Sequence, residues 1–395
     1  MRKVALWMLV LLAVAALLGA CSRAPRAAYG GVIKIGHIAP LTGDIPKVGE
    51  NGQRAMEMWL EEIGGKLNVG GTEYKVQVIT EDNESKAESA AAAATKLITE
   101  DQVLAIIGPY ASKQAIPAGE VANKKQTPMI SPWSTNPRTT KDRPYVFRAA
   151  FLDDFQGQVL AQFAKDEFGA QKVAVLYDVA SDYPKGLAEY FKKAAEDLGM
   201  EVVAFESFTT GDKDFSAQLT NIINSGADVL FTPQYYNEVP LIVKQAKQLG
   251  WDKPILGSDS WGSTELMKLC GDDCVGYYFS THWAVGGAKG KAKEFIDKFT
   301  AKYGEEPDDV AALAWDSAHL LQTAIENCGQ LTGDLAKDRK CIRDALASIP
   351  EFEGVTGRMR FNDQGDPIKC AIIVRINEDH QFEQYKMVCP PEMNK

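Results

Sequence analysis

The chain has 395 residues, of which 45% are hydrophobic and 24% are charged, and its formal net charge is −10 at pH 7. This length is sufficient for two or three domain-sized cores. The acidic balance argues against nucleic acid as a partner, because nucleic-acid-binding proteins present basic surfaces.

The N-terminus predicts an export signal rather than part of the fold. A positive pair at residues 2 and 3 precedes an apolar run at residues 4–17, which ends in Leu-Gly-Ala before Cys21. The run is shorter than the apolar stretch that a membrane-spanning helix needs, and the small residues before the cysteine resemble a lipobox. We expect residues 1–20 to be a cleaved signal peptide, with a lipid on Cys21 and a tether over residues 21–28. A plain signal peptide followed by an accidental cysteine is the alternative.

From residue 32 onward, strand patterns alternate with helix patterns. The first half predicts strands at 32–38, 76–79, 104–107 and 128–131, and helices at 52–63, at 85–99 and after residue 111. The second half predicts strands at 172–177, 202–208, 228–232 and 254–257, and helices at 155–168, 185–198, 215–224 and 239–249. Residues 288–349 are mostly helical, and the last strands, at 357–361 and 370–388, favour antiparallel pairing. This alternation predicts an α/β fold of two doubly wound lobes, with parallel sheets covered on both faces.

Hydroxyl residues follow two neighbouring strands of the first half. Ser112 comes shortly after the apolar run 104–107 and takes the N-cap position of the next helix. The following strand ends at Trp133, Ser134 and Thr135. Both strand ends reach the carboxyl edge of one sheet, where open α/β sheets bind ligands, and a helix N-terminus suits a carboxylate. Ser112 and Thr135 could also be ordinary helix caps.

The cysteines predict disulfides. Seven are present, and with Cys21 assigned to the lipid six remain, an even number in an exported chain. Cys370 and Cys389 flank two strand-like runs about a polar turn. Cys270 and Cys274 enclose a short loop, and Cys328 and Cys341 would close a loop between helices. The expected pairs are Cys270–Cys274, Cys328–Cys341 and Cys370–Cys389. Metal binding is the competing use, but no CxxC pair or Cys/His cluster is present, so we expect no metal.

The order of short motifs resembles the type I periplasmic binding proteins, especially the branched-chain amino-acid (Leu/Ile/Val) ABC transporter family. The motifs are IGHIAPLTG at 35–43, IGPYAS at 107–112, ISPWST at 130–135, DVASDYPKG at 178–186, ILGSD at 255–259 and WDSA at 315–318. The resemblance covers residues 30–390 and implies two lobes of the Venus-flytrap type joined by a three-strand hinge. It implies an N-terminal lobe of residues 29–150 plus 280–350, and a C-terminal lobe of residues 151–279 plus 351–395.

The resemblance also implies roles for the first-lobe residues. Ser112 would hold the α-carboxylate of the ligand. The main chain near Trp133 and Ser134, with the hydroxyl and N–H of Thr135, would bind the ammonium and the carboxylate.

In the second lobe, the resemblance implies that Tyr183 and Tyr235 close over the ligand. Asp259 would pair with the ammonium, at a position where the family often carries Glu. A zwitterion loses its hydration in a cleft, so both of its charges need fixed partners. Asp259 could instead begin a turn, and the two tyrosines could be ordinary packing residues.

No catalytic motif accompanies these residues, so we expect neither an enzyme nor a cofactor. The pairs Asp153-Asp154 and Asp308-Asp309 are expected to begin helices, and none of the four histidines is assigned a site. The resemblance implies an exported, lipid-anchored periplasmic or cell-surface protein that delivers an amino acid or similar solute to ABC permease subunits. A lipoprotein that senses a ligand with a separate signalling partner is the alternative.

Overall fold

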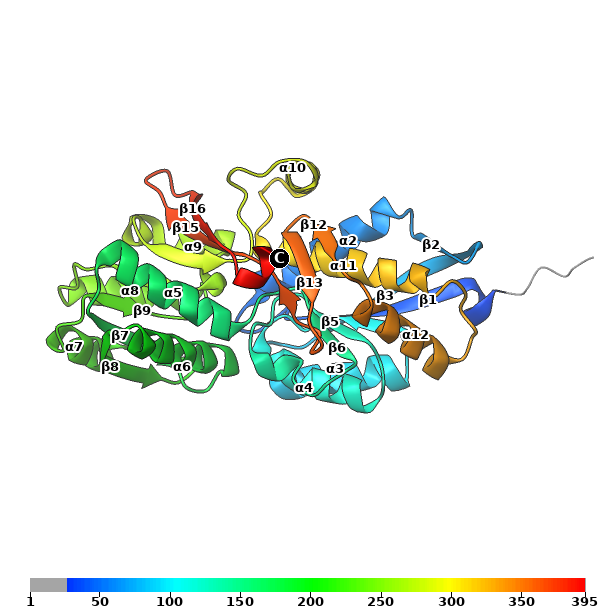
Figure 1. The fold of residues 1–395 in the computed structure, drawn as a ribbon, viewed down its shortest axis with the longest axis horizontal. Coiled ribbons are helices and arrows are strands. Elements are labelled where there is room, and N and C mark those ends of the chain that lie inside the picture. The colour runs from blue at the N-terminus through cyan, green and yellow to red at the C-terminus, as the bar shows by residue number, and fades with distance from the viewer. Residues whose placement is uncertain (1–26, 395) are drawn as a thin grey trace, which may run out of the picture.

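The structure of the protein, a computed structural model, describes residues 27–394. The expected signal peptide and the lipidation site Cys21 lie outside the described residues. Within the described range, none of the helices is both long and apolar enough to cross a membrane. Figure 1 shows two lobes arranged along the long axis of the molecule, each with helices packed around a sheet.

The first lobe is built on a six-stranded sheet in the order β2-β3-β1-β4-β5-β6. Its strands are β1 (Val32–Ala39), β2 (Lys66–Val69), β3 (Thr72–Asp82), β4 (Ala105–Ile107), β5 (Met129–Ser131) and β6 (Val146–Arg148). All neighbouring strands run parallel except β2 and β3. The three short strands β4, β5 and β6 are buried at every position, as expected for parallel strands covered on both faces.

The helices of the first lobe come from two parts of the chain. They are α2 (Pro46–Glu62), α3 (Ala87–Thr99) and α4 (Ser112–Lys124) from the first half of the chain, and α10 (Lys291–Tyr303), α11 (Asp309–Asn327) and α12 (Leu335–Ala347) from the second. Helix α11 packs against α2 and α12, and α3 packs against α4. The start predicted at residue 52 for α2 was wrong, because Pro46 already fits the first turn of a helix, where no N–H is needed.

The second lobe is built on a seven-stranded sheet in the order β16-β15-β11-β10-β9-β7-β8. Its strands are β7 (Lys172–Asp178), β8 (Glu201–Phe208), β9 (Val229–Phe231), β10 (Ile255–Gly257), β11 (Tyr278–Thr281), β15 (Ala371–Ile376) and β16 (Phe382–Val388). Its helices are α5 (Asp153–Phe168), α6 (Asp182–Asp197), α7 (Ser216–Asn224), α8 (Val239–Gln248) and α9 (Thr264–Cys270). The hairpin β15–β16 is antiparallel, as its sequence pattern predicted.

A small third sheet lies against the first lobe. It consists of β12 (Phe352–Gly354), β13 (Gly357–Phe361) and β14 (Pro367–Ile368). The Nε atom of Arg148 lies 2.7 Å from Asp366 Oδ1, and Asp316 on α11 accepts the backbone N–H of Val355 at 2.8 Å. The chain therefore passes into the second lobe for the last time after β14. We propose that residues 351–368 belong with the first lobe, and we propose the other lobe boundaries as the sequence predicts them.

Three disulfides join Cys270 to Cys274, Cys328 to Cys341, and Cys370 to Cys389. All three expected pairs are confirmed. The second pair ties the end of α11 to α12, and the third closes the β15–β16 hairpin. Such links stabilise the fold mainly by restricting the unfolded chain.

One buried histidine makes the stability of the fold depend on pH. His37, on β1, is fully buried, with Nε2 at 2.9 Å from the hydroxyl of Tyr110 and Nδ1 at 3.3 Å from Thr80 Oγ1. Burial lowers the pKa of His37 to about 4. Between about pH 4 and pH 6.5, the ring is therefore neutral in the folded protein but protonated in the unfolded chain.

Acidification from pH 6.5 to pH 4 is expected to lower the free energy of unfolding, because only the unfolded chain protonates this histidine in that window. The contribution of His37 is about 3 kcal/mol across the window. Burial also raises the pKa of Asp308 to about 6, and this carboxyl acts in the opposite direction as the pH falls through 6. Urea unfolding of wild type and His37→Gln at pH 7 and pH 4.5 separates the two effects. Between pH 7 and pH 4.5, the free energy of unfolding should fall less in His37→Gln than in the wild type. An equal fall in both proteins would show that His37 does not cause this pH dependence.

Candidate functional site

The first-lobe residues expected at the site meet at the carboxyl edge of the first sheet. Helix α4 begins at Ser112, and Ala111, with extended backbone, occupies the N-cap. The predicted N-cap role of Ser112 was therefore wrong by one residue. Its Oγ instead lies 2.9 Å from Ser134 Oγ and accepts the N–H of Asn136 at 3.3 Å. These contacts tie the end of one strand to the end of the next.

Thr135 is buried to 1% exposure, and its hydroxyl lies beside the Asp153 carboxyl, where it partly offsets the rise in the pKa of that group. Its carbonyl accepts the N–H of Asp153 at 3.0 Å, which joins it to the first residue of α5 in the other lobe. Trp133 is also buried and donates from Nε1 to Asp309 Oδ2 at 3.3 Å. The first lobe thus offers a helix N-terminus and a buried hydroxyl.

The second-lobe site residues gather around the carboxylate of Asp259. This residue follows β10 and begins the short helix η3 (Asp259–Trp261), so it also starts a turn. The hydroxyl of Tyr183, on α6, donates to Asp259 Oδ1 at 2.5 Å. Gln156 Nε2 donates to the same oxygen at 2.7 Å, and His282 Nε2 lies 3.3 Å from Oδ2.

The two sets of residues meet where the lobes touch. The rings of Trp133 and Tyr235 lie 6.1 Å apart between centroids, and those of Tyr235 and Tyr183 lie 5.4 Å apart. Nearby, Asn136 Nδ2 donates across the lobes to the carbonyl of Asp182 at 2.9 Å. The structure thus brings all seven residues expected at the site into one region between the lobes.

Four residues of this region were not predicted from the sequence. Asp153 and Asp309 do begin helices as expected, but Asp153 also lies against Thr135 of the first lobe, and Asp309 contacts Trp133. Gln156 lies one turn after Asp153 on α5. This spacing is visible in the sequence and places both side chains on one face of the helix. His282 also binds Asp259, although no histidine had been assigned a site, and its ring lies 3.8 Å from that of Phe151.

The region carries an excess of buried acid. Burial raises the pKa values of Asp153 and Asp309 well above their ordinary range, and the nearby carboxylate of Asp259 adds to both shifts. Burial also lowers the pKa of His282, so this ring favours its neutral form. Arg148 partly opposes the charge of Asp153. Anion-binding groups therefore lie on the first lobe, whereas the acids are divided, with Asp153 and Asp259 on the second lobe and Asp309 on the first.

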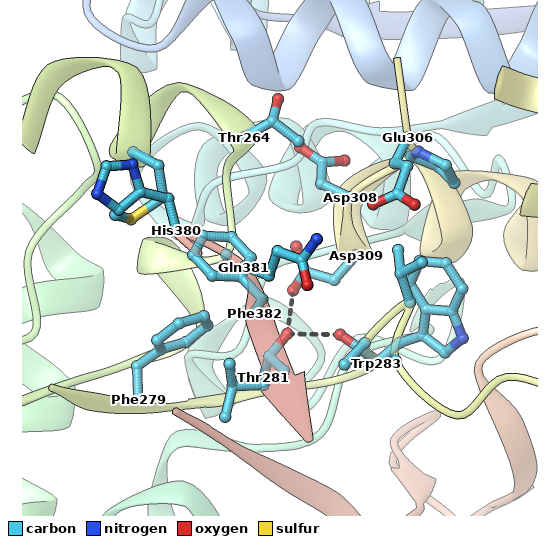
Figure 2. Close-up of a pocket in the computed structure, with 17 residues that line it drawn as sticks. Thr264, Phe279, Thr281, Trp283, Glu306, Asp308, Asp309, His380, Gln381 and Phe382 are labelled. Carbon is cyan, nitrogen blue, oxygen red and sulfur yellow. Dashed lines mark hydrogen bonds between the residues drawn. The ribbon is translucent and has the colours of Figure 1, made fainter. Parts of the chain in front are cut away.

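Two cavities adjoin the site. One, of about 30 Å³, opens beside Tyr235 and Ser181 at the contact between the lobes. The other, of about 320 Å³, lies next to Thr281 and Asp309 (Figure 2). Within residues 27–394, no group of three or more His, Cys, Asp or Glu side chains is arranged to hold a metal ion.

Residues 32–381 match the family model described as "Periplasmic binding protein". The Leu/Ile/Val-binding protein BraC3 of Rhizobium johnstonii is 30% identical over 336 residues, which cover 85% of this chain and 88% of that protein. A leucine-, isoleucine-, valine-, threonine-, and alanine-binding protein of Pseudomonas aeruginosa is 29% identical, over 85% of this chain and 87% of that protein.

Solved structures agree with this grouping. The crystal structure of the leucine-binding protein LivK from Thermotoga maritima superposes with a TM-score of 0.85 at 33% identity, covering 91% of this chain and 99% of that one. The branched-chain amino acid transporter substrate-binding protein LivJ from Streptococcus pneumoniae, in complex with isoleucine, gives a TM-score of 0.82 at 34% identity, covering 91% and 100%. The resemblance seen in the sequence and the two-lobed α/β fold are both confirmed. The chain belongs to the type I periplasmic binding protein family, whose members are exported solute-binding proteins.

Proposed function

We propose that this protein binds the zwitterion of an α-amino acid between its two lobes and delivers it to an ABC importer. One observation carries the proposal. Ser112 at the start of α4 and Thr135 after β5 lie on the first lobe, and Thr135 contacts Asp153 of the second lobe, near the Asp259 carboxylate, where the lobes touch. Relatives described as binding leucine, isoleucine and valine support the same class of ligand.

The first lobe suits the α-carboxylate of the ligand. The N-terminus of α4 presents N–H groups that no residue of the helix can satisfy, and its dipole favours negative charge. Ser112 lies in the first turn, and the hydroxyl of Thr135 is buried. We assign the carboxylate to these groups.

The second lobe suits the α-ammonium. Asp259 is buried to 1% exposure, and Tyr183 and Gln156 fix the direction of its carboxylate. Burial raises the pKa of Asp153, and a ligand cation held beside the neighbouring Asp259 would favour its ionised form. A charged hydrogen bond to a buried carboxylate is stronger than a neutral one, so the ammonium gains most from this side of the cleft.

Binding at a site shared by two lobes favours the form in which the lobes are closed, and we propose that this form docks on the permease. A lipid on Cys21 would keep the protein at the membrane, where the permease lies. Sensing with a separate signalling partner remains the second candidate, since the same closure could report the presence of the ligand.

Removing the Asp259 charge should weaken amino-acid binding without unfolding the protein. We expect Asp259→Asn to weaken binding by about 1–3 kcal/mol, because the ammonium loses its charged partner, and Ser112→Ala to weaken it by a similar amount. Titration calorimetry with L-leucine and the other amino acids measures both effects.

Asp166→Asn is the matched control, because Asp166 is an exposed acid on α5 of the same lobe. It should leave affinity unchanged. Unaltered affinity in both site variants would show that the site is misplaced, and a flat response of the wild type to every amino acid would reject the ligand class.

Closure of the lobes leaves little room at Gly186. A Cβ added at this position of α6 would lie 2.7 Å from Asn136 Nδ2 in the other lobe. Gly186→Leu is therefore expected to hold the lobes apart, weaken ligand binding and enlarge the radius of gyration measured by small-angle X-ray scattering. Glu189→Leu, on the exposed face of the same helix, is the control. A variant at Gly186 that is as compact and as tight-binding as the control would contradict the closure seen here.

A further inference from the structure

The larger cavity beside the site has apolar walls and an acidic end. Its volume is about 320 Å³, and Phe279, Phe382 and Met267 contribute apolar surface to it. Asp309 lines the side next to the amino-acid site. Figure 2 shows its carboxylate among the lining side chains, joined by a dashed line to Thr281.

Asp309 is buried but only half satisfied. Its Oδ2 accepts hydrogen bonds from Thr281 Oγ1 at 3.0 Å and from Trp133 Nε1 at 3.3 Å. Its Oδ1 has no partner among the described residues, although the side chain is only 2% exposed. A Cβ at Gly262, three residues after Asp259, would lie 3.2 Å from this oxygen. The unpartnered oxygen therefore points across the contact between the lobes, toward the segment that carries Asp259.

The charges around Asp309 do not balance. Burial raises the pKa of Asp309, and the like charges of Asp308 and Asp259 nearby raise it further. Lys369 is near enough to sense Asp309, but its Nζ donates to Thr356 Oγ1 at 2.8 Å. No lysine or arginine within residues 27–394 forms an ion pair with Asp309. Without a cation this buried acid favours its protonated form, and a ligand that brings a second positive charge would favour the carboxylate and pair with it.

We infer that Asp309 and this cavity receive a cationic side chain of the ligand, so that the protein prefers basic α-amino acids such as lysine, ornithine or arginine. The inference rests on the proposed function, because Asp259 and Asp153 must take the α-ammonium for Asp309 to be left for a second cation. The apolar walls accommodate the methylene stem, and the acidic end accommodates the charged group.

The test compares two ligands of nearly the same shape. L-norleucine has the carbon skeleton of L-lysine without the side-chain ammonium. We expect the full exported protein to bind L-lysine, L-ornithine or L-arginine at least about 10-fold more tightly than L-norleucine in titration calorimetry, because a charged hydrogen bond replaces an unsatisfied carboxylate.

Asp309→Asn should reduce that preference to less than about threefold, since an uncharged amide no longer rewards the second positive charge. Glu326→Gln, an exposed acid on the same helix, is the matched control and should leave the preference intact. The wild-type ratio needs no variant, so the inference stays testable even if Asp309→Asn does not fold.

The outcomes separate the inference from the proposed function. Tighter binding of L-norleucine or L-leucine than of every basic amino acid would overturn the inference and leave the proposed function standing. A preference for basic ligands that survives in Asp309→Asn would also overturn it. If no α-amino acid binds at all, the proposed function itself fails.

Discussion

The burial of the Asp259 carboxylate between two lobes is the interaction on which the rest of the site depends. A buried charge is tolerated only when hydrogen bonds or opposite charges surround it. Here Tyr183 from α6, Gln156 from α5 and His282 after β11 converge on one carboxylate. Three separate elements of the second lobe are therefore held in fixed positions by one side chain. The same constraint prepares the acidic half of a cleft whose other half is a helix N-terminus.

The crossings between the lobes are also polar and buried, which suits a hinge. Arg148, at the end of β6, is fully buried and pairs with Asp366 beside the last crossing. Lys369 is buried to 2% exposure near Asp316, and burial lowers its pKa to about 8. Directional contacts such as these fix the path of each crossing strand, whereas apolar packing alone would leave several arrangements of similar energy. The lobes can then move as rigid bodies about a small set of defined joints.

The region between the lobes differs in chemistry from one side to the other. Hydroxyls and helix N–H groups lie on the first lobe together with Asp309, and Asp153 and Asp259 lie on the second. A ligand with charges at both ends would satisfy both lobes only by bridging them, which links occupancy to closure. Tyr183 and Gln156 both donate to the same carboxylate oxygen of Asp259. Asp309 adds an acid beyond those that one α-ammonium requires.

The sequence by itself determined the fold class, the alternation of strands and helices, the three cysteine pairs and the family, because each is written in local patterns or in the order of short motifs. It also singled out Ser112, Thr135, Tyr183 and Asp259. Only the tertiary structure brought His282 to Asp259 and turned the unpartnered oxygen of Asp309 toward Gly262. These contacts join segments far apart in the chain, and no periodicity or spacing records them. Hydrogen bonding between distant elements is decided when the lobes pack, so a linear pattern cannot show it.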